Sequence, residues 1–147
     1  MEGLGYFLLF AIVVWFLLQI RKGYAGSGAS AQSVNSGAFE TKVVGESHYQ
    51  PALDKICGGR CEDGVNQHAS ATLVLEDDNR YDKNAVRVEI SNTTVGYLAR
   101  EDARLYRKRL RDKGNKAPRT CRAVIRGGWD RGGDDQGYFG VRLDLDL

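Results

Sequence analysis

The stretch DDNRYDKNAVRVEI, residues 77–90, begins as a polar run and ends as an alternating one. Its second half places three β-branched residues at every other position: Val86, Val88 and Ile90. This period of two is typical of a strand that buries one face. SNT (91–93) predicts a turn, and TVGYL (94–98) predicts the returning strand of a hairpin. The polar half poses a separate question, because an aromatic residue, Tyr81, stands where Asp, Asn or Gly would suffice for a turn.

Four further segments are typical of strands. Two precede the hairpin and two follow it: FETKVVG (39–45), ASATLVLE (69–76), RTCRAVIRGG (119–128) and GYFGVRLDLDL (137–147). The last segment alternates throughout, which predicts Val141, Leu143, Leu145 and Leu147 inward and Arg142, Asp144 and Asp146 outward. The strands therefore occur on both sides of the hairpin, which favours a mainly β fold.

Between the strands the sequence predicts one or two helices. REDARLYRKRLRDK (100–113) has an apolar stripe at helical spacing, formed by Ala99, Ala103, Tyr106 and Leu110. Its acidic first turn and basic last turn also suit the helix dipole. YQPALDKICGG (49–59) predicts a shorter helix that ends at two glycines. At least five short strands with so few helices favour a small closed or half-closed β-barrel, and an open α+β sheet is the alternative.

The chain begins with an apolar segment, LGYFLLFAIVVWFLLQI (4–20), which contains no charged residue. Its 17 residues are at the short end of what spans a bilayer, so we expect a single transmembrane helix that anchors the chain. A secretory signal peptide is the competing interpretation, but a basic segment before the apolar run is missing. Arg21 and Lys22 follow the run, which predicts that the soluble domain faces the cytoplasm. Residues 21–38 are predicted to form a flexible linker rich in Gly, Ser and Ala, and residues 39–147 the folded domain.

Charge is modest overall but uneven along the chain. The net charge of +2 argues against a protein that binds polyanions over its whole surface. Residues 100–126, however, hold eleven Lys and Arg against three acidic residues. Such a run is either the solvated face of a helix or an anion-binding surface. For the second interpretation, phosphate backbones are the first candidate ligand and anionic lipids are the second.

The sequence lacks the residue patterns of a catalytic or metal site. Its three cysteines are an odd number, which argues against a full set of disulfides and suggests reduced thiols. CGGRC (57–61) with His68 downstream invites a zinc interpretation, but the usual second pair of ligands is missing. Two histidines do not assemble into a nucleophile–His–acid arrangement, and no phosphate-binding loop motif is present. We therefore expect no cofactor and no enzyme activity.

Three successive motifs resemble those of the HIRAN domain family, which occurs at the front of helicase-like transcription factor and alone in bacterial and phage proteins. They are VVGESHYQPAL (43–53), NRYDKNAVRVEI (79–90) and VGYLAREDARLY (95–106). The resemblance covers roughly residues 40–146. It implies an OB-like β-barrel that binds single-stranded DNA at its 3′ end.

The resemblance also implies roles for particular residues. Asp82 would accept a hydrogen bond from the terminal 3′-hydroxyl, and Tyr81 would pack against the terminal nucleotide. Tyr97 occupies the place of an imidazole that faces the DNA, and Arg100 matches a nearby basic residue. Phe139, on the final strands, would close the pocket.

The chain departs from the family's pattern at one of these places. Where the family has an arginine followed by two aromatic residues, this chain has Ser47, His48 and Tyr49. His48 and Tyr49 keep the aromatic character, but the missing arginine leaves one phosphate contact in doubt.

A purely structural interpretation of the polar stretch stands beside this one. Asp82 and Asn84 would cap a turn before a strand, as Asp and Asn commonly do, and Tyr81 would cover the end of the barrel as part of the core. The functional hypothesis is a membrane-tethered, non-catalytic module that binds a free 3′ end of single-stranded DNA. The alternative is a module at the cytoplasmic face of the membrane that binds a protein or peptide partner.

Overall fold

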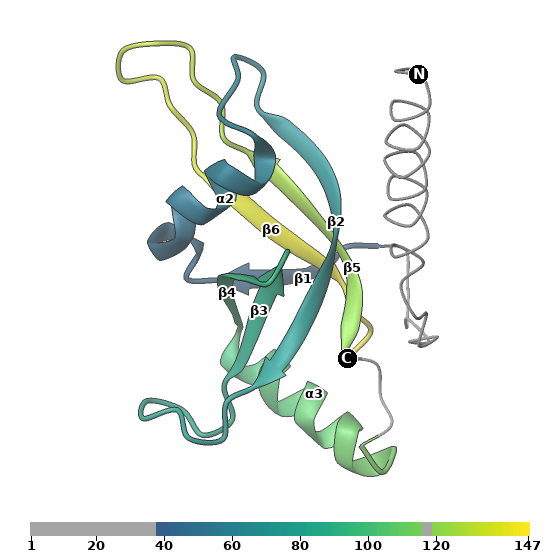
Figure 1. Cartoon of the computed structure of the whole chain (residues 1–147). Coiled ribbons are helices and arrows are strands. Elements are labelled where there is room, and N and C mark those ends of the chain that lie inside the picture. Colours follow the sequence, from purple (N-terminus) through teal and green to yellow (C-terminus); the bar gives the residue numbers. More distant parts are fainter. Residues whose placement is uncertain (1–37, 116–118) are drawn as a thin grey trace, which may run out of the picture. The chain divides into compact units, whose positions relative to one another are not determined.

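The computed structural model describes residues 38–115 and 119–147, and their strands close into a barrel (Figure 1). Neighbouring strands are antiparallel, in the order β1-β4-β3-β2-β5-β6. Their bounds are β1 (Thr41–Val44), β2 (Val65–Leu75), β3 (Val86–Ile90), β4 (Thr93–Leu98), β5 (Thr120–Gly127) and β6 (Phe139–Asp144). The helices are the short 3₁₀ helix η1 (Glu46–Tyr49), α2 (Gln50–Cys57) and α3 (Arg100–Asp112). The mainly β barrel is therefore confirmed in its closed form, and the open α+β sheet is wrong.

The core lies inside the barrel, and the hairpin supplies its centre. Val86, Val88 and Ile90 of β3 are each at most 2% exposed, as the alternating pattern predicts. Burying a side chain of this size contributes about 1.5–3 kcal/mol. The predicted stripe of α3 is buried as well, at Ala103, Tyr106 and Leu110. It brings α3 against one end of the barrel, while α2 lies toward the other end (Figure 1).

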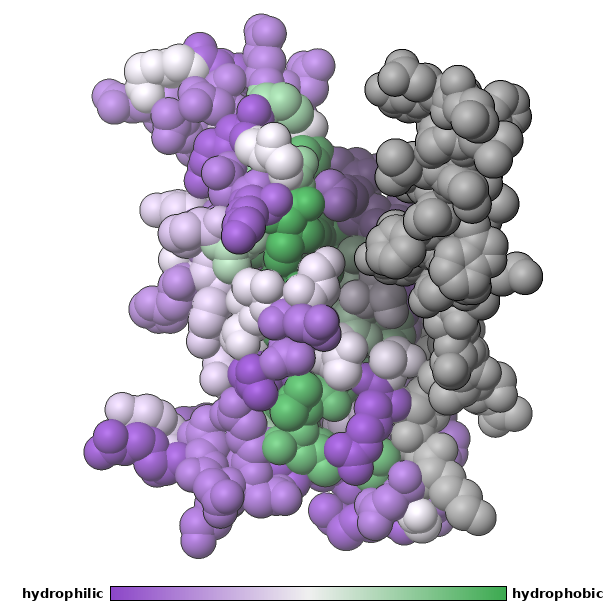
Figure 2. All heavy atoms as spheres, viewed as in Figure 1, coloured by the Kyte–Doolittle hydropathy of each residue, from purple (hydrophilic) through white to green (hydrophobic). Residues whose placement is uncertain are grey.

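The surface shows no large apolar face in the view that is drawn. On that side, hydrophilic residues cover the loop between β2 and β3, and apolar surface forms separate patches between hydrophilic ones, one of them in the region of α3 (Figure 2). Patches of that kind are normal for a folded domain and indicate no large interface on this side.

β2 begins earlier than the sequence predicts. The expected strand starts at residue 69, whereas β2 starts at Val65 and pairs with β5 from Val65↔Gly127 to Thr72↔Thr120. Its first half carries Asn66, Gln67 and His68, which lack the apolar alternation on which the sequence prediction depends. Main-chain pairing with β5 forms this part of the strand, and propensity does not reveal such a partner.

The last strand follows its predicted alternation only in part. Val141 and Leu143 are buried as predicted, but β6 ends at Asp144, and Leu145 and Leu147 pack against the core from beyond it. Asp144, predicted on the outer face, is fully buried because Arg122 of the neighbouring strand covers it. Its carboxylate accepts hydrogen bonds from Arg122 Nε and Nη2, and this compensates for the loss of water.

Gly96 allows the paired strands β1 and β4 to lie close together. A Cβ added to Gly96 would lie 2.5 Å from Val43 Cγ1 and 2.7 Å from the Val44 carbonyl oxygen, and its φ is +151°. A bulge at Val88/Glu89 of β3 faces the same part of β4. The close approach pairs Val44 of β1 with Tyr97, the next residue of β4. A glycine in the VGYL motif is thus required by packing, and it sets the position of the tyrosine beside it.

The described residues contain no helix that is long and apolar enough to cross a membrane. The predicted anchor, residues 4–20, and the predicted linker as far as residue 37 lie outside the described residues.

Candidate functional site

A hollow of the described domain lies where β1, β4 and the start of α3 meet the loop between β2 and β3. Its volume is about 500 Å³. The lining residues are Val44, His48, Asn79, Tyr81, Asp82, Ala85, Tyr97, Leu98, Arg100 and Ala103. Five of the seven residues predicted to form a site thus come together here from separate parts of the sequence: His48, Tyr81, Asp82, Tyr97 and Arg100. The walls are largely apolar and carry a few polar groups, which is the usual composition of a binding pocket.

Tyr81 stands at the surface with its ring open to solvent. The residue is 82% exposed, so the interpretation of Tyr81 as a core residue is wrong. The guanidinium carbon of Arg80 lies 5.4 Å from the centre of the ring, a distance typical of a cation–π contact. An exposed ring that is held beside a cation offers a flat face for stacking.

The two carboxylate oxygens of Asp82 have different partners, one in the turn and one across the pocket. Its Oδ1 accepts a hydrogen bond from the Asn84 backbone N at 2.8 Å, so the predicted turn cap is confirmed. Its Oδ2 lies 3.8 Å from Arg100 Nε across the pocket. The Asp82 side chain is 20% exposed, whereas that of Arg100 is 75% exposed. One oxygen is therefore committed to the backbone, and the other meets a loosely held cation.

Tyr97 lies on the pocket wall and is supported by Tyr49. The two ring centres are 6.5 Å apart with planes tilted by 48°. Burial, and then a hydrogen bond with the Tyr49 side chain, raises the pKa of Tyr97 to about 12. The Tyr97 hydroxyl therefore stays protonated throughout the physiological range and can donate a hydrogen bond. Tyr49 does not line the pocket and contributes to it through this contact.

Phe139 is not brought to this pocket. It is 2% exposed, and its backbone N donates a hydrogen bond to Gln50 Oε1 at 2.8 Å, toward the α2 end of the barrel. The Arg60 guanidinium carbon lies 5.2 Å from the centre of its ring. Phe139 was predicted to close the pocket, but this first residue of β6 points into the core.

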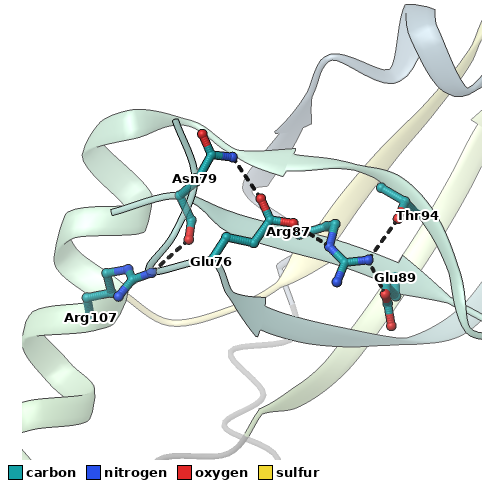
Figure 3. A network of polar contacts seen from close by, with 7 residues as sticks. Glu76, Asn79, Arg87, Glu89, Thr94 and Arg107 are labelled. Carbon is teal, nitrogen blue, oxygen red and sulfur yellow. Dashed lines mark hydrogen bonds and ion pairs between the residues drawn. The ribbon is translucent and has the colours of Figure 1, made fainter. Parts of the chain in front are cut away.

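Asn79 shapes the loop that carries Tyr81 and Asp82, and the sequence analysis did not single it out. Its Oδ1 accepts hydrogen bonds from the backbone N of Tyr81, at 2.9 Å, and of Asp82, at 3.1 Å. Its Nδ2 donates to Glu76 Oε2 at 2.8 Å, and Glu76 in turn pairs with Arg87 of β3 (Figure 3). An Asn two residues before the aromatic is a recognisable turn signal that would have found this role.

The network continues from the loop into the barrel. Arg87 also pairs with Glu89 on its own strand, and it donates a hydrogen bond to Thr94 Oγ1 of β4 at 3.1 Å (Figure 3). The loop is thus connected to two neighbouring strands through side chains. A loop held this way keeps its ligand-facing groups in place before a ligand arrives.

Arg107 fastens the same loop to α3. Its Nε and Nη2 donate hydrogen bonds to the carbonyl oxygens of Asn84 and Ala85, both at 2.9 Å, and its Nη1 pairs with Asp77 Oδ1 at 2.6 Å. In the sequence this arginine is one of many bases in a row, and its role depends on the facing loop. Composition alone could not have distinguished it.

Part of the basic run between residues 100 and 126 is engaged in ion pairs. Four of its bases are paired with acidic side chains, three of them outside the run: Arg107 with Asp77, Lys108 with Asp112, Arg109 with Asp146 and Arg122 with Asp144. Four of the eleven basic side chains therefore serve internal ion pairs. Arg100 lies at the pocket, where its only ion-pair contact within the described residues is the long one to Asp82.

The residues considered for zinc stay apart. Across residues 38–115 and 119–147, no three His, Cys, Asp or Glu side chains are grouped so as to hold a metal ion. Cys61 Sγ donates a hydrogen bond to the Gly64 carbonyl oxygen, and His68 packs against the ring of Phe39 with centres 5.4 Å apart. Burial, and then Asp54, raises the pKa of Cys57, which favours a neutral thiol over the thiolate that a metal needs.

Comparison with known proteins adds a family to this geometry. The sequence model of the HIRAN domain matches residues 36–127. A crystal structure of a protein from Lactobacillus plantarum is similar at 23% identity, over 71% of this chain and 91% of that one, with a TM-score of 0.37. No curated protein matches.

Proposed function

Because the chain belongs to the HIRAN domain family, whose members are generally non-catalytic DNA-binding modules, we propose that its pocket binds the free 3′ end of single-stranded DNA. Single-stranded nucleic acid is commonly bound by aromatic stacking combined with positive charge. The pocket offers both, through the exposed ring of Tyr81 and through Arg100.

The observation that carries the proposal is the carboxylate of Asp82 inside a pocket of rings and a cation. A carboxylate repels phosphate, so it would be a poor neighbour for the interior of a strand. A strand that ends in a hydroxyl has a proton to donate, and Asp82 Oδ2 is an acceptor that the turn does not use. The arrangement therefore favours a free 3′-hydroxyl over a 3′-phosphate.

The other lining residues have roles that fit a terminal nucleotide. Tyr81 stacks on its base, and Tyr97 lines the wall of the same pocket. His48 lies on the β1 side of the same pocket. Arg100 is exposed and long enough to reach the phosphate that precedes the terminal sugar.

A titration with strands of different end chemistry tests the proposal. The full-length chain is titrated with 5′-labelled oligonucleotides of one sequence that end in a 3′-hydroxyl or a 3′-phosphate, and with a circular strand of similar length. We expect the 3′-hydroxyl strand to bind at least about tenfold more tightly than the 3′-phosphate strand, since one close charge repulsion exceeds about 1.4 kcal/mol. It should also bind more tightly than the circular strand, which has no end to enter the pocket. Equal affinity for the three ligands would show that the end is not recognised.

The alternative of a peptide-binding module finds less support. Strand addition needs a free sheet edge, and the described strands close on themselves. A peptide terminus in the pocket is the other form of this alternative. Binding of a peptide C-terminus, without binding of any oligonucleotide at physiological salt, would favour it.

We also propose that residues 4–20 anchor the domain to the cytoplasmic face of a membrane. The support is the uncharged apolar run and the Arg21–Lys22 pair that follows it. The full-length chain is expected in the membrane fraction after carbonate extraction, and a chain that starts at residue 38 in the supernatant. Recovery of both chains in the supernatant would refute the anchor.

A further inference from the structure

A second hollow lies beside the pocket, on the outer face of β1, β5 and β6. Its volume is about 300 Å³. The lining residues are Lys42, Val43, Glu46, Arg126, Gly140, Val141 and Arg142. Three of these seven residues are cations, so the hollow is basic, and nothing derived above uses it.

The hollow exists because a glycine stands between the basic side chains. Lys42 of β1 pairs with Arg142 of β6, and Arg126 of β5 pairs with Gly140, two residues before Arg142. A Cβ built at Gly140 would meet no atom within 4 Å, so the space above this residue is open. The three cations therefore surround a floor that is flat backbone, and a flat floor lets a ligand approach all of them.

The charges around this hollow are available to a ligand. Within the described chain, Lys42 and Arg142 form no ion pair, in contrast to four bases of the run between residues 100 and 126. Arg126 Nε donates a hydrogen bond to the neutral amide of Asn66 at 3.3 Å and keeps its charge unpaired. The acid in the lining, Glu46, directs Oε1 to the Val141 backbone N at 3.4 Å. Three cations face one carboxylate, which leaves a positive hollow.

The basic hollow adjoins the pocket along β1. Val44 lines the pocket and Lys42 lines the hollow; both are exposed on the same face of the strand, about 7 Å apart by strand geometry. η1 borders both spaces as well, with His48 at the pocket and Glu46 at the hollow. The distance from β4 to β5, measured across β1 and β6, is three strand spacings, about 14 Å. That length equals about four nucleotides of a stacked strand and fewer of an extended one.

We propose that the basic hollow binds the phosphates of the nucleotides just upstream of the 3′ end, and so extends the pocket into a track of about five nucleotides in all, one in the pocket and about four along the strands. The inference rests on the proposed function, because the strand would enter the hollow only after its end is held. The ligand class is a single-stranded phosphodiester chain. A row of cations that lies above a flat floor suits the regularly spaced phosphates of such a chain.

Oligonucleotides of increasing length test the track. The full-length chain is titrated with 3′-hydroxyl strands of two, four, six and ten nucleotides. We expect affinity to rise from two to six nucleotides, because six is the first tested length that fills a track of about five, and then to level off. In the double variant Lys42→Gln/Arg142→Gln, this gain is expected to disappear, and the slope of log affinity against log salt for the six-nucleotide strand to fall by about 1.4, at about 0.7 for each lost contact. The preference for a 3′-hydroxyl over a 3′-phosphate should persist, because the pocket is unchanged.

Two further variants make the test specific. Lys55→Gln/Arg111→Gln also removes two exposed charges, from residues that line neither space, and is expected to keep the gain with length. Gly140→Glu fills the floor with an acidic side chain and, given the open space, is expected to fold while losing the gain.

The outcomes separate this inference from the proposed function. The track would be overturned if the increase of affinity with strand length persisted in Lys42→Gln/Arg142→Gln. It would also be overturned if this increase were lost equally in the control pair. Binding of anionic vesicles that depends on Lys42 and Arg142, while oligonucleotide binding does not, would overturn it as well. If the hydroxyl and phosphate ends bind alike but the gain with length still depends on the hollow, the track stands and end recognition fails.

Discussion

Replacing Asp82 with asparagine is expected to erase the discrimination between a 3′-hydroxyl and a 3′-phosphate, by strengthening the phosphate complex about 10- to 100-fold. Two unit charges 4 Å apart interact with about 4 kcal/mol at an effective dielectric of about 20, and solvent at an open pocket reduces this to about 1.4–2.7 kcal/mol. The Asn side chain removes the negative charge that opposes the phosphate. Its carbonyl oxygen can still accept the hydrogen bond from the Asn84 backbone N, so the turn is retained.

The measurement is a pair of titrations, with hydroxyl-ended and phosphate-ended strands, on the wild type and on Asp82→Asn. Asp78→Asn is the matched control, because Asp78 is an exposed acid in the same loop that does not line the pocket. Asp82→Ala loses the turn contact together with the charge, and comparison of its thermal midpoint with that of Asp82→Asn separates the two effects. A phosphate penalty that is unchanged in Asp82→Asn would contradict the proposed role of the carboxylate.

Replacing Tyr81 with alanine is expected to weaken binding of the 3′-hydroxyl strand by about 5- to 150-fold while leaving the stability of the domain unchanged. Stacking of a base on an aromatic ring contributes about 1–3 kcal/mol. The ring is 82% exposed, so its removal creates no cavity, and surface substitutions of this kind change stability by about 0.5 kcal/mol or less. The loop is expected to keep its shape because the Asn79 side chain accepts a hydrogen bond from the Tyr81 backbone N. The Tyr81 side chain takes no part in that bond.

Affinity and thermal midpoint are measured together on the same preparations. Tyr81→Phe retains a stacking face and is expected to bind like the wild type. Tyr138→Ala removes another ring, 74% exposed, that lies outside the pocket lining, and is expected to leave the affinity unaltered. Equal affinity of Tyr81→Ala and the wild type would show that the exposed ring does not contact the strand.

The hairpin shows why the fold was accessible from the sequence. Burial of one face imposes a period of two on Val86, Val88 and Ile90, and a period of this kind can be read without knowing the partner strand. The stripe of α3 was accessible for the same reason. The early start of β2 and the burial of Asp144 were not, because each depends on a neighbour from elsewhere in the chain.

The residues of the site also differ in whether the sequence alone could predict them. Resemblance to a family pointed to Tyr81, Asp82 and Tyr97, which lie within short motifs. It also pointed to Phe139, where the match is loose and the ring proved to be buried. The sequence analysis did not predict the roles of Asn79 and Arg107. Asn79 has a turn signal that was not used, and the role of Arg107 depends on the loop that faces it.

By itself, the sequence determined a mainly β domain, the hairpin at its centre and the helix at one end, since each follows from the local periodicity of apolar residues. Only the tertiary structure decided that the barrel closes, that most of the predicted residues share one pocket and that Arg107 fastens its loop. It also decided that Lys42, Arg126 and Arg142 gather around Gly140, although these three cations are at least 16 positions apart in the chain. Strand pairing brings such positions together through main-chain hydrogen bonds, and their register depends on the whole barrel.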